Sequence, residues 1–199
     1  MQWSDNGFVL SIRKHGETAA LVTLLTREHG RHAGLVRGGA GRRQRGTLQI
    51  GNLVQVTWRA RLVEHLGTLS CELLGAHAAA LMDMKMPLLA LGAATGLLEL
   101  SLPERAPHPE LFERFAVLVE ALSVPKWEAH YVRWELDLLA NLGFGLDLRE
   151  CAATGSKDGL IYVSPRTGCA VSAIAGEPYR DRLLSLPSFL LDNKSTADS

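Results

Sequence analysis

The hydrophobic periodicity of this chain changes near Ala76, and this change constrains the fold more than any other feature of the sequence. Residues 8–75 contain short β-type segments separated by turns that include glycine. After Ala76, apolar residues recur at helical spacing. We therefore expect an α+β protein, with a β domain at residues 1–78 followed by an α-helical domain at residues 79–191.

Five β segments are predicted in the first domain. In residues 52–59 the side chains of Val54, Val56 and Trp58 share one face, which is the alternation typical of a strand with one buried side. The other four segments are residues 8–12, 18–26, 31–37 and 67–74. Five strands in so short a stretch predict a small closed barrel, and the OB-fold is the commonest barrel with that strand count. An SH3-like barrel is the alternative.

The spacing of apolar residues predicts helices at residues 77–84, 87–101, 109–122 and 126–142. The last helix is the best supported, because Trp127, Tyr131 and Trp134 fall on one apolar stripe and Gly143 supplies a stop.

The end of the chain has a different character from these helices. A loop-rich insertion is expected at about residues 145–175, with a hairpin around residues 161–163. We expect a short helix near residues 178–186 after it, and a disordered tail at residues 192–199 because that segment is polar.

Charge is distributed unevenly along the chain. The whole sequence has 21 Lys and Arg against 21 Asp and Glu, but residues 1–78 hold ten of the basic residues and only five of the acidic ones. All ten lie between Arg13 and Arg61, where only Glu17 and Glu28 oppose them. Such a basic stretch indicates a partner rich in phosphate.

The most concentrated part of this stretch is residues 37–46, RGGAGRRQRG, which we call the arginine loop. It contains four arginines, Arg37, Arg42, Arg43 and Arg45, and four glycines. Arginine makes forked contacts to phosphate oxygens, and glycine lets main-chain N–H groups approach a ligand closely. The loop therefore predicts binding of a nucleic-acid backbone without reading of its sequence. The alternative is an ordinary solvated connection between strands.

Trp58 is a second candidate for nucleic-acid binding. Arg59 and Arg61 follow it, so its indole could offer a stacking surface for a base beside two cations. Its phase with Val54 and Val56 instead favours burial in the barrel. Both interpretations stay open at this point.

The motifs of common enzymes are missing from the sequence. No Gly-Lys-Ser/Thr follows the glycines of the arginine loop, and no Gly-x-Ser-x-Gly occurs. A magnesium-dependent nuclease would need clustered carboxylates near the basic surface, where only Glu17 and Glu28 are available. We expect neither enzymatic activity nor a cofactor, and no small-molecule substrate.

Residues 151–175 have the outline of a small zinc ribbon without its ligands. A structural zinc site needs four ligands, usually in two Cys-x-x-Cys pairs. Here the four positions hold Cys151, Thr154, Ser172 and Ala175, so three of them cannot supply a thiolate. We expect a degenerate zinc-ribbon-like hairpin that binds no metal.

The cysteines and the apolar runs bear on the compartment. Three widely spaced cysteines and the absence of a signal sequence favour the cytoplasm. The longest apolar stretch, residues 87–102, is interrupted and shorter than the roughly 20 residues that cross a bilayer, so no membrane span is expected.

Short motifs in a fixed order carry a resemblance along the whole chain. They are HGET at 15–18, TREHGR at 26–31, LVRGG at 35–39, LQ at 48–49, RWELDLL at 133–139, LGFGLDL at 142–148, CA at 151–152, and SP at 164–165 with Gly168. In this order and spacing they resemble the bacterial RecO family of recombination mediators. Many members of that family carry a four-cysteine zinc site, of which Cys151 would be the sole remnant here.

The resemblance implies an N-terminal OB-fold joined to an α-helical domain. It also implies a protein that binds single- and double-stranded DNA, anneals complementary strands and helps load RecA onto DNA coated with SSB. Its partners would be RecR, the SSB C-terminal tail, the RecA filament indirectly and, in many species, RecF, in the cytoplasm at the nucleoid. The DNA contacts would come from Arg31, Arg37, Arg42, Arg43, Arg45, Arg59 and Arg61.

The resemblance has one further consequence for the helical domain, and one other function is an alternative to it. Relatives usually continue beyond the last residue of this chain with a further helical stretch, which implies an exposed apolar strip on the helical domain. A protein-interaction adaptor, whose barrel and arginine loop bind acidic partner tails without binding DNA directly, is the alternative to a mediator.

Overall fold

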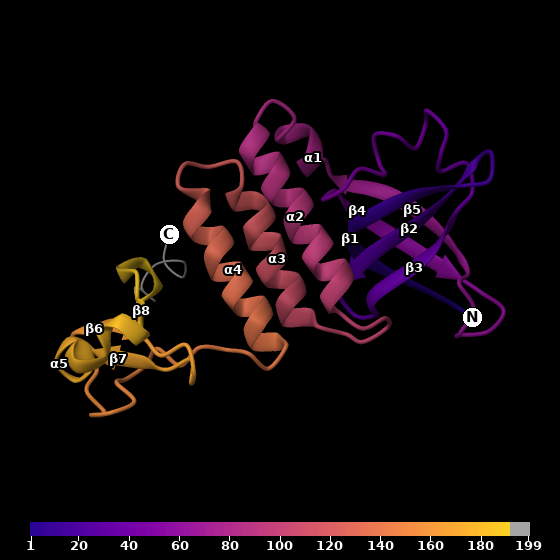
Figure 1. Ribbon diagram of the computed structural model, residues 1–199. Coiled ribbons are helices and arrows are strands. Elements are labelled where there is room, and N and C mark those ends of the chain that lie inside the picture. Colours follow the sequence, from indigo (N-terminus) through magenta and orange to yellow (C-terminus); the bar gives the residue numbers. More distant parts are fainter. Residues whose placement is uncertain (192–199) are drawn as a thin grey trace. The chain divides into compact units, whose positions relative to one another are not determined.

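The structure is a computed structural model that describes residues 1–191 (Figure 1). Its contacts divide the chain into two compact units, Met1–Tyr131 and Val132–Ser199. No helix in the described part of the chain is long and apolar enough to cross a membrane.

The first unit begins with a closed barrel of five strands, and this confirms the predicted architecture of an OB-fold followed by helices. The strands are β1 (Gln2–His15), β2 (Ala19–Thr26), β3 (Gly30–Val36), β4 (Leu53–Arg59) and β5 (Thr68–Gly75). Their order around the barrel is β1-β2-β3-β5-β4. All neighbours are antiparallel except β3 and β5, whose single register pair, Leu35 with Thr68, is parallel.

Strand β1 is much longer than the predicted residues 8–12. Its first half, from Gln2 to Phe8, pairs with β4, and its second half, from Gly7 to His15, pairs with β2. A bulge between Val9 and Ser11 bends the strand between the two partners. The first half lacks a hydrophobic alternation of its own, so pairing with β4, rather than a local pattern, makes it a strand.

The core of the barrel follows the alternation that the sequence predicts. Val54, Val56 and Trp58 of β4 are buried, whereas Gln55 and Arg59 are exposed. The same core contains Val9, Ala20, Val22, Leu24, Val36, Leu48, Leu69 and Cys71.

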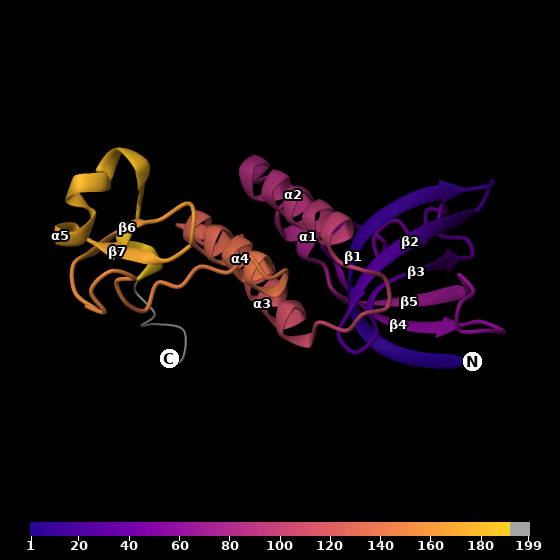
Figure 2. The same ribbon diagram turned by 60° about the horizontal axis from the view of Figure 1, so that its bottom comes forward.

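Three helices of the first unit follow the barrel: α1 (His77–Ala80), α2 (Lys85–Ser101) and α3 (Pro109–Ala121). Helix α2 lies beside β1 in both Figure 1 and Figure 2. The ring of Phe8 in β1 packs at 5.1 and 5.0 Å from the rings of Phe112 and Phe115 in α3. Helix α1 is shorter than the predicted residues 77–84.

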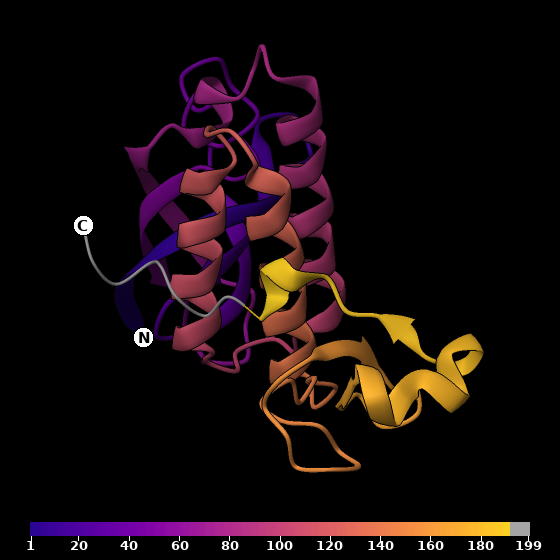
Figure 3. The same ribbon diagram turned by 90° about the vertical axis from the view of Figure 1, so that its left-hand side faces the viewer.

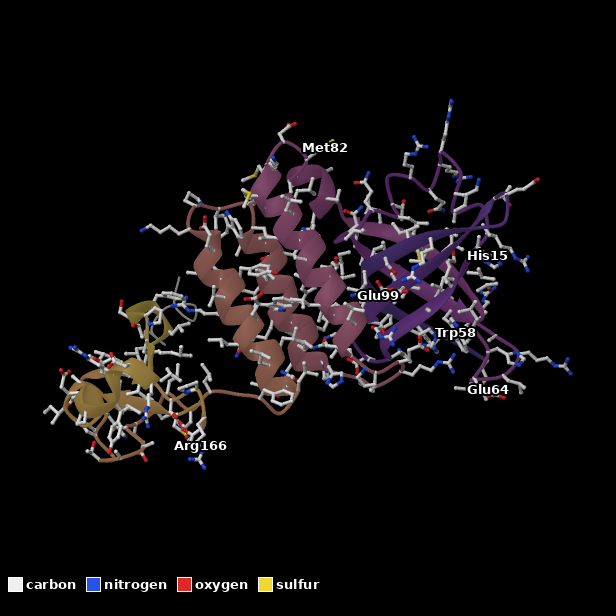
Figure 4. All side chains as sticks on the ribbon, viewed as in Figure 1. His15, Trp58, Glu64, Met82, Glu99 and Arg166 are labelled. Carbon is white, nitrogen blue, oxygen red and sulfur yellow. The ribbon has the colours of Figure 1, made fainter. Side chains whose placement is uncertain are left out.

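A polar contact also joins α2 to the barrel. One carboxylate oxygen of Glu99 accepts hydrogen bonds from Ser11 at 2.7 Å, Arg13 at 3.3 Å and Thr23 at 3.4 Å. Figure 4 labels Glu99 on α2. These contacts place the helices in the same compact unit as the strands, so residue 78 marks the end of the barrel and not the end of a compact unit.

Helix α2 has two apolar faces. Leu91, Ala94 and Leu98 are buried. On another face Met86, Leu89, Leu97 and Leu100 are exposed, by 61, 58, 39 and 87% respectively. Helix α2 therefore exposes an apolar stripe in addition to the face that it buries.

Helix α4 (Trp127–Asn141) contains the boundary between the two units. Beyond it, β6 (Leu160–Val163), β7 (Ala170–Ser172) and β8 (Leu184–Ser185) form a small antiparallel sheet in the order β7-β6-β8. The short helix α5 (Ala173–Gly176) lies beside β6 and β7 in Figures 1 and 2, and Figure 3 shows this part of the chain, in orange and yellow, from another side. The hairpin expected around residues 161–163 is β6 and β7.

One expectation about the end of the chain needs correction, and another concerns residues outside the described part of the chain. The predicted helix at 178–186 is a 3-10 helix, η1 (Glu177–Arg182), followed by β8, because the partner strand β6 recruits Leu184 and Ser185 into the sheet. A further 3-10 helix, η2, covers Ser188–Leu190. The tail expected to be disordered, residues 192–199, lies outside the described residues.

Where a zinc ribbon would have its metal ligands, this chain has a hydrophobic cluster around Cys151. Cys151 is 1% exposed and packs with Leu160, Val163, Ala170, Val171 and Leu186. Its sulfur accepts the main-chain N–H of Ser172 at 3.3 Å. Within residues 1–191, no group of three or more His, Cys, Asp or Glu side chains is arranged to hold a metal ion. The zinc-ribbon likeness of the hairpin is therefore not confirmed.

Candidate nucleic-acid interface

The arginine loop leaves the barrel directly after β3 and consists of consecutive turns. The main-chain N–H of Gly39 donates to Val36, and that of Ala40 donates to Thr18 in the β1–β2 turn, at 3.1 and 3.0 Å. A Cβ atom on Gly39 would lie 2.8 Å from the Cβ of Ala20, so only glycine fits there. The base of the loop is thus fixed to the barrel.

Asn52 anchors the other end of the connection. It is 1% exposed, and its side-chain amide donates to the main-chain oxygens of Gly46 at 2.9 Å and Thr47 at 3.2 Å. Its side-chain oxygen accepts the N–H of Ala78 at 3.1 Å. The sequence analysis missed this residue, because a single Asn in a turn gives no local sign of such a role.

The arginines of the loop are available to a ligand. Arg37, Arg42, Arg43 and Arg45 are all exposed, and none of them forms an ion pair with another residue of the described chain. Figure 4 shows nitrogen-tipped side chains of this segment reaching away from the barrel. Four unpaired guanidinium groups on an anchored loop form a site suited to phosphate.

The strand register places Arg59 two strands away from the end of β3, and Arg61 follows at the start of the β4–β5 loop. Arg59 pairs with Thr68, and Thr68 pairs with Leu35, two residues before Arg37. Strands β3 and β4 are therefore separated only by β5, or about 10 Å. Both Arg59 and Arg61 are exposed, and neither forms an ion pair within the described chain.

Lys14 adds a cation that the sequence analysis did not select. It is exposed near the β1–β2 turn, whose Thr18 accepts the hydrogen bond from the arginine loop. The strand pairings alone carry this information, so the sequence could not have placed Lys14 beside the loop. We call Lys14, the four loop arginines, Arg59 and Arg61 the basic rim.

Arg31, selected in the sequence analysis as a DNA contact, differs from the residues of the basic rim because its side chain has partners within the protein. Its Nε atom donates to the main-chain oxygen of Leu102 at 2.8 Å, and its guanidinium lies 3.4 Å from the carboxylate of Glu104. The side chain is only 18% exposed. Arg31 therefore connects β3 to the segment between α2 and α3.

Trp58, the second candidate for nucleic-acid binding, is buried in the structure. It is 1% exposed, and its ring N–H donates to the main-chain oxygen of Leu66 at 3.0 Å. The indole of Trp3 stacks against it with ring centres 5.7 Å apart. The burial of Trp58 agrees with the alternation in β4, which favoured this interpretation over a stacking role.

Comparison with known proteins supplies an independent line of argument. The sequence model "Recombination protein O N terminal" matches residues 1–76, and "Recombination protein O C terminal" matches residues 87–198. Together they cover the barrel and most of the remaining chain.

Relatives with high identity carry one name. Proteins called "DNA repair protein RecO" are similar to this chain in Rhodospirillum centenum, at 58% identity over 193 residues, and in Methylorubrum populi, at 55% over 193 residues. These alignments cover 96% of this chain and 77 and 78% of the two relatives. The protein of that name from Rhodopseudomonas palustris strain TIE-1 is 52% identical over 196 residues, 98% of this chain and 78% of its own length. The chain therefore belongs to the RecO family of DNA repair proteins.

Proposed function

We propose that this protein binds single- and double-stranded DNA through its basic rim and thereby anneals complementary strands. The observation that carries the proposal is the arginine loop, which is anchored at both ends and presents four exposed arginines without ion-pair partners among residues 1–191. Cations on such a loop neutralise phosphates on two strands at once, which lowers the repulsion between the strands. The chemistry is one of binding alone, with no bond made or broken.

The proposal extends to a mediator role in homologous recombination. DNA bound on the rim would be handed to RecA on strands coated with SSB, together with RecR and, in many species, RecF. Binding of the SSB C-terminal tail would recruit the protein to such strands and place it at the nucleoid. Membership of the family supports this part of the proposal, which can be tested by mixing the purified protein with RecR or with a labelled peptide of the SSB tail.

The decisive experiment is fluorescence anisotropy with a labelled oligonucleotide across a salt series. Single-stranded DNA held by four loop contacts gives a slope of log K against log salt of about −3. Replacing Arg42, Arg43 and Arg45 with Ala should make that slope shallower by about 2 and slow the annealing of complementary strands. The melting temperature should stay nearly unchanged, because exposed charges contribute little to stability.

A matched control separates the loop from a general charge effect. Replacing Arg166, Arg180 and Arg182 with Ala removes the same number of charges from exposed positions in the second unit. This variant should keep the salt slope of the wild type. An unchanged slope in the loop variant would refute the proposal, and loss of binding to an acidic peptide with DNA binding retained would favour the adaptor.

A further inference from the structure

The arginine loop returns to the barrel through residues 47–52, which we call the return segment. Leu48 in this segment is 5% exposed and belongs to the barrel core, and its N–H donates to the main-chain oxygen of Gln44 in the arginine loop at 2.8 Å. The side-chain amide of Asn52 donates to the main-chain oxygens of Gly46 and Thr47. The return segment is therefore held by one apolar side chain in the core and by one buried polar side chain.

The polar groups of Asn52 reach three separate parts of the first unit. Its side-chain amide serves the end of the arginine loop, and its side-chain oxygen accepts the N–H of Ala78 in α1. Its main-chain oxygen accepts the N–H of Val9 in β1 at 3.0 Å, and its own N–H donates to Gln49 at 3.0 Å. Both the donor and the acceptor end of the side chain are thus satisfied, which is the condition for burying an amide at 1% exposure.

The position of Asn52 is itself fixed by its neighbour Gly51. The N–H of Gly51 donates to the main-chain oxygen of Val9 at 2.8 Å, beside the bulge of β1. Gly51 has a φ of 84°, and a Cβ atom on it would lie 2.4 Å from Cδ2 of Leu91 in α2. The main chain therefore passes close to α2 just before Asn52, and the amide that holds the loop sits on a rigid part of the unit.

The two ends of the arginine loop are held in different ways. Gly39 and Ala40 at its beginning make main-chain hydrogen bonds, to Val36 and Thr18 respectively. The hydrogen bonds from Asn52 at its end come from a side chain, so a single substitution removes them and leaves every arginine in place. A loop that is ordered before its ligand arrives loses less conformational entropy on binding.

We propose that Asn52 is a positioning residue for DNA, which holds the arginine loop in the conformation that meets the phosphates. Asn52 is buried and contacts the loop main chain, so it acts through the arginines and does not touch the DNA. The proposal rests on the proposed function, since DNA is held by the loop. Its own consequence is that a change at Asn52 weakens DNA binding without removing any charge from the protein.

The test uses two variants of Asn52 and a matched control. Asn52→Ala removes the side-chain amide, and Asn52→Leu removes it while keeping the side chain close to its original volume. Thr26→Val serves as the control, because Thr26 is 0% exposed and its hydroxyl donates to the main-chain oxygen of Gly30 at 2.8 Å. This contact belongs to the β2–β3 turn, at the opposite end of β2 from the arginine loop. Circular dichroism identifies the variants that fold.

Fluorescence anisotropy with a single-stranded oligonucleotide measures the effect. The Asn52 variants should bind about tenfold more weakly at each salt concentration, with the salt slope of the wild type, because the loop must be ordered on binding while the number of charges is unchanged. Thr26→Val should bind as the wild type does. Wild-type affinity in a folded Asn52 variant would overturn the proposal.

A double-mutant cycle separates positioning from a general effect on the fold. In a protein that already carries Ala at Arg42, Arg43 and Arg45, Asn52→Ala should weaken binding by no more than about twofold. The same tenfold loss in this background would show that Asn52 does not act through the loop arginines, and the proposal would be wrong.

A last measurement is independent of DNA. NMR relaxation of the free protein should give main-chain order parameters typical of a rigid loop for residues 42–46 in the wild type and in Thr26→Val, and values below about 0.6 in Asn52→Ala. If the wild type does not bind DNA but Asn52→Ala loosens the loop, the proposed function fails and the role of Asn52 in ordering the loop stands. Equal order parameters in Asn52→Ala and the wild type would refute that role.

Discussion

The Nε atom of Arg31 donates to the main-chain oxygen of Leu102 at 2.8 Å and joins the third strand of the barrel to the end of α2. An isolated β-bridge between Arg31 and Glu104 joins β3 to the segment that follows α2. An arginine in a basic segment here has a structural role, so charge alone does not identify the residues that bind DNA.

Replacing Arg31 with Ala should lower the free energy of unfolding by about 1–3 kcal/mol, because the Leu102 oxygen loses a charged donor. The salt slope of DNA binding should stay that of the wild type. Urea unfolding and anisotropy measure the two quantities. Arg59→Ala is the opposite case, with weaker DNA binding and unchanged stability. A drop in affinity with no loss of stability in the Arg31 variant would return this residue to the basic rim.

Replacing Glu99 with Ala should destabilise the first unit by about 1–3 kcal/mol, because Ser11 and Thr23 lose their shared acceptor in a partly buried site. Glu99→Gln keeps an oxygen acceptor and should have a smaller effect. Glu17→Ala removes an exposed carboxylate from the β1–β2 turn and serves as the control. Chemical denaturation followed by circular dichroism gives all three values, and equal stability of the Ala variant and the wild type would contradict the prediction.

His32 should make the protein less stable in acid. Its pKa is about 4 in the folded protein, against about 6.5 in the unfolded chain. Between these values the unfolded chain binds more protons than the folded protein, so stability rises with pH. The contribution is complete above about pH 6.5 and is lost progressively as the pH falls toward 4.

The size of this loss is on the order of 3 kcal/mol. His32→Phe should flatten the dependence of unfolding free energy on pH in this window, as measured by urea denaturation at several pH values. His15→Phe should leave the dependence as it is in the wild type. Identical curves for the His32 variant and the wild type would show that the imidazole is not held in its neutral form.

Gly30 and Gly16 form a natural pair for testing the β turns. Both have positive φ angles, 67° and 62°. A Cβ atom on Gly30 would lie 2.0 Å from the main-chain oxygen of Ala106, whereas one on Gly16 would meet nothing within 4 Å. Gly16→Ala should therefore cost about 1 kcal/mol through backbone strain alone, and Gly30→Ala at least about 3 kcal/mol. Thermal unfolding of the two variants provides the comparison.

The parts of the fold that could be predicted from sequence are those with local patterns. Alternation in β4 fixed which face of that strand is buried, and the spacing of apolar residues located α2, α3 and α4. Positions that depend on distant pairing could not be predicted. The polar first half of β1 is a strand only because β4 lies beside it, and Leu184 joins a sheet only because β6 is available.

The candidate site shows the same division. The arginine loop could be found from its composition, because its exposed charges need no partner elsewhere in the chain. The structural role of Arg31 and the place of Lys14 beside the loop both depend on residues far apart in sequence. The phase of Trp58 with Val56 along the strand indicated burial, whereas its charged neighbours suggested that it stacks on a base. In this case the strand pattern was the stronger indicator.

The parallel pairing of β3 with β5 has a consequence for how the barrel moves. The antiparallel neighbours in the barrel share many register pairs. Strands β3 and β5 share one register pair, Leu35 with Thr68, and the N–H of Leu35 donates to the main-chain oxygen of Gly67 at 3.1 Å. These two contacts close the barrel. We expect local opening of the barrel to need the least free energy at this seam, so its amide hydrogens should exchange with solvent before those of the other strand pairs. The arginine loop begins two residues after Leu35, and the β4–β5 loop ends at the residue before Thr68. A strand of DNA that contacts both loops would span the seam and hold it closed. The amide hydrogens of the seam would then exchange with solvent more slowly in the DNA-bound barrel than in the free one.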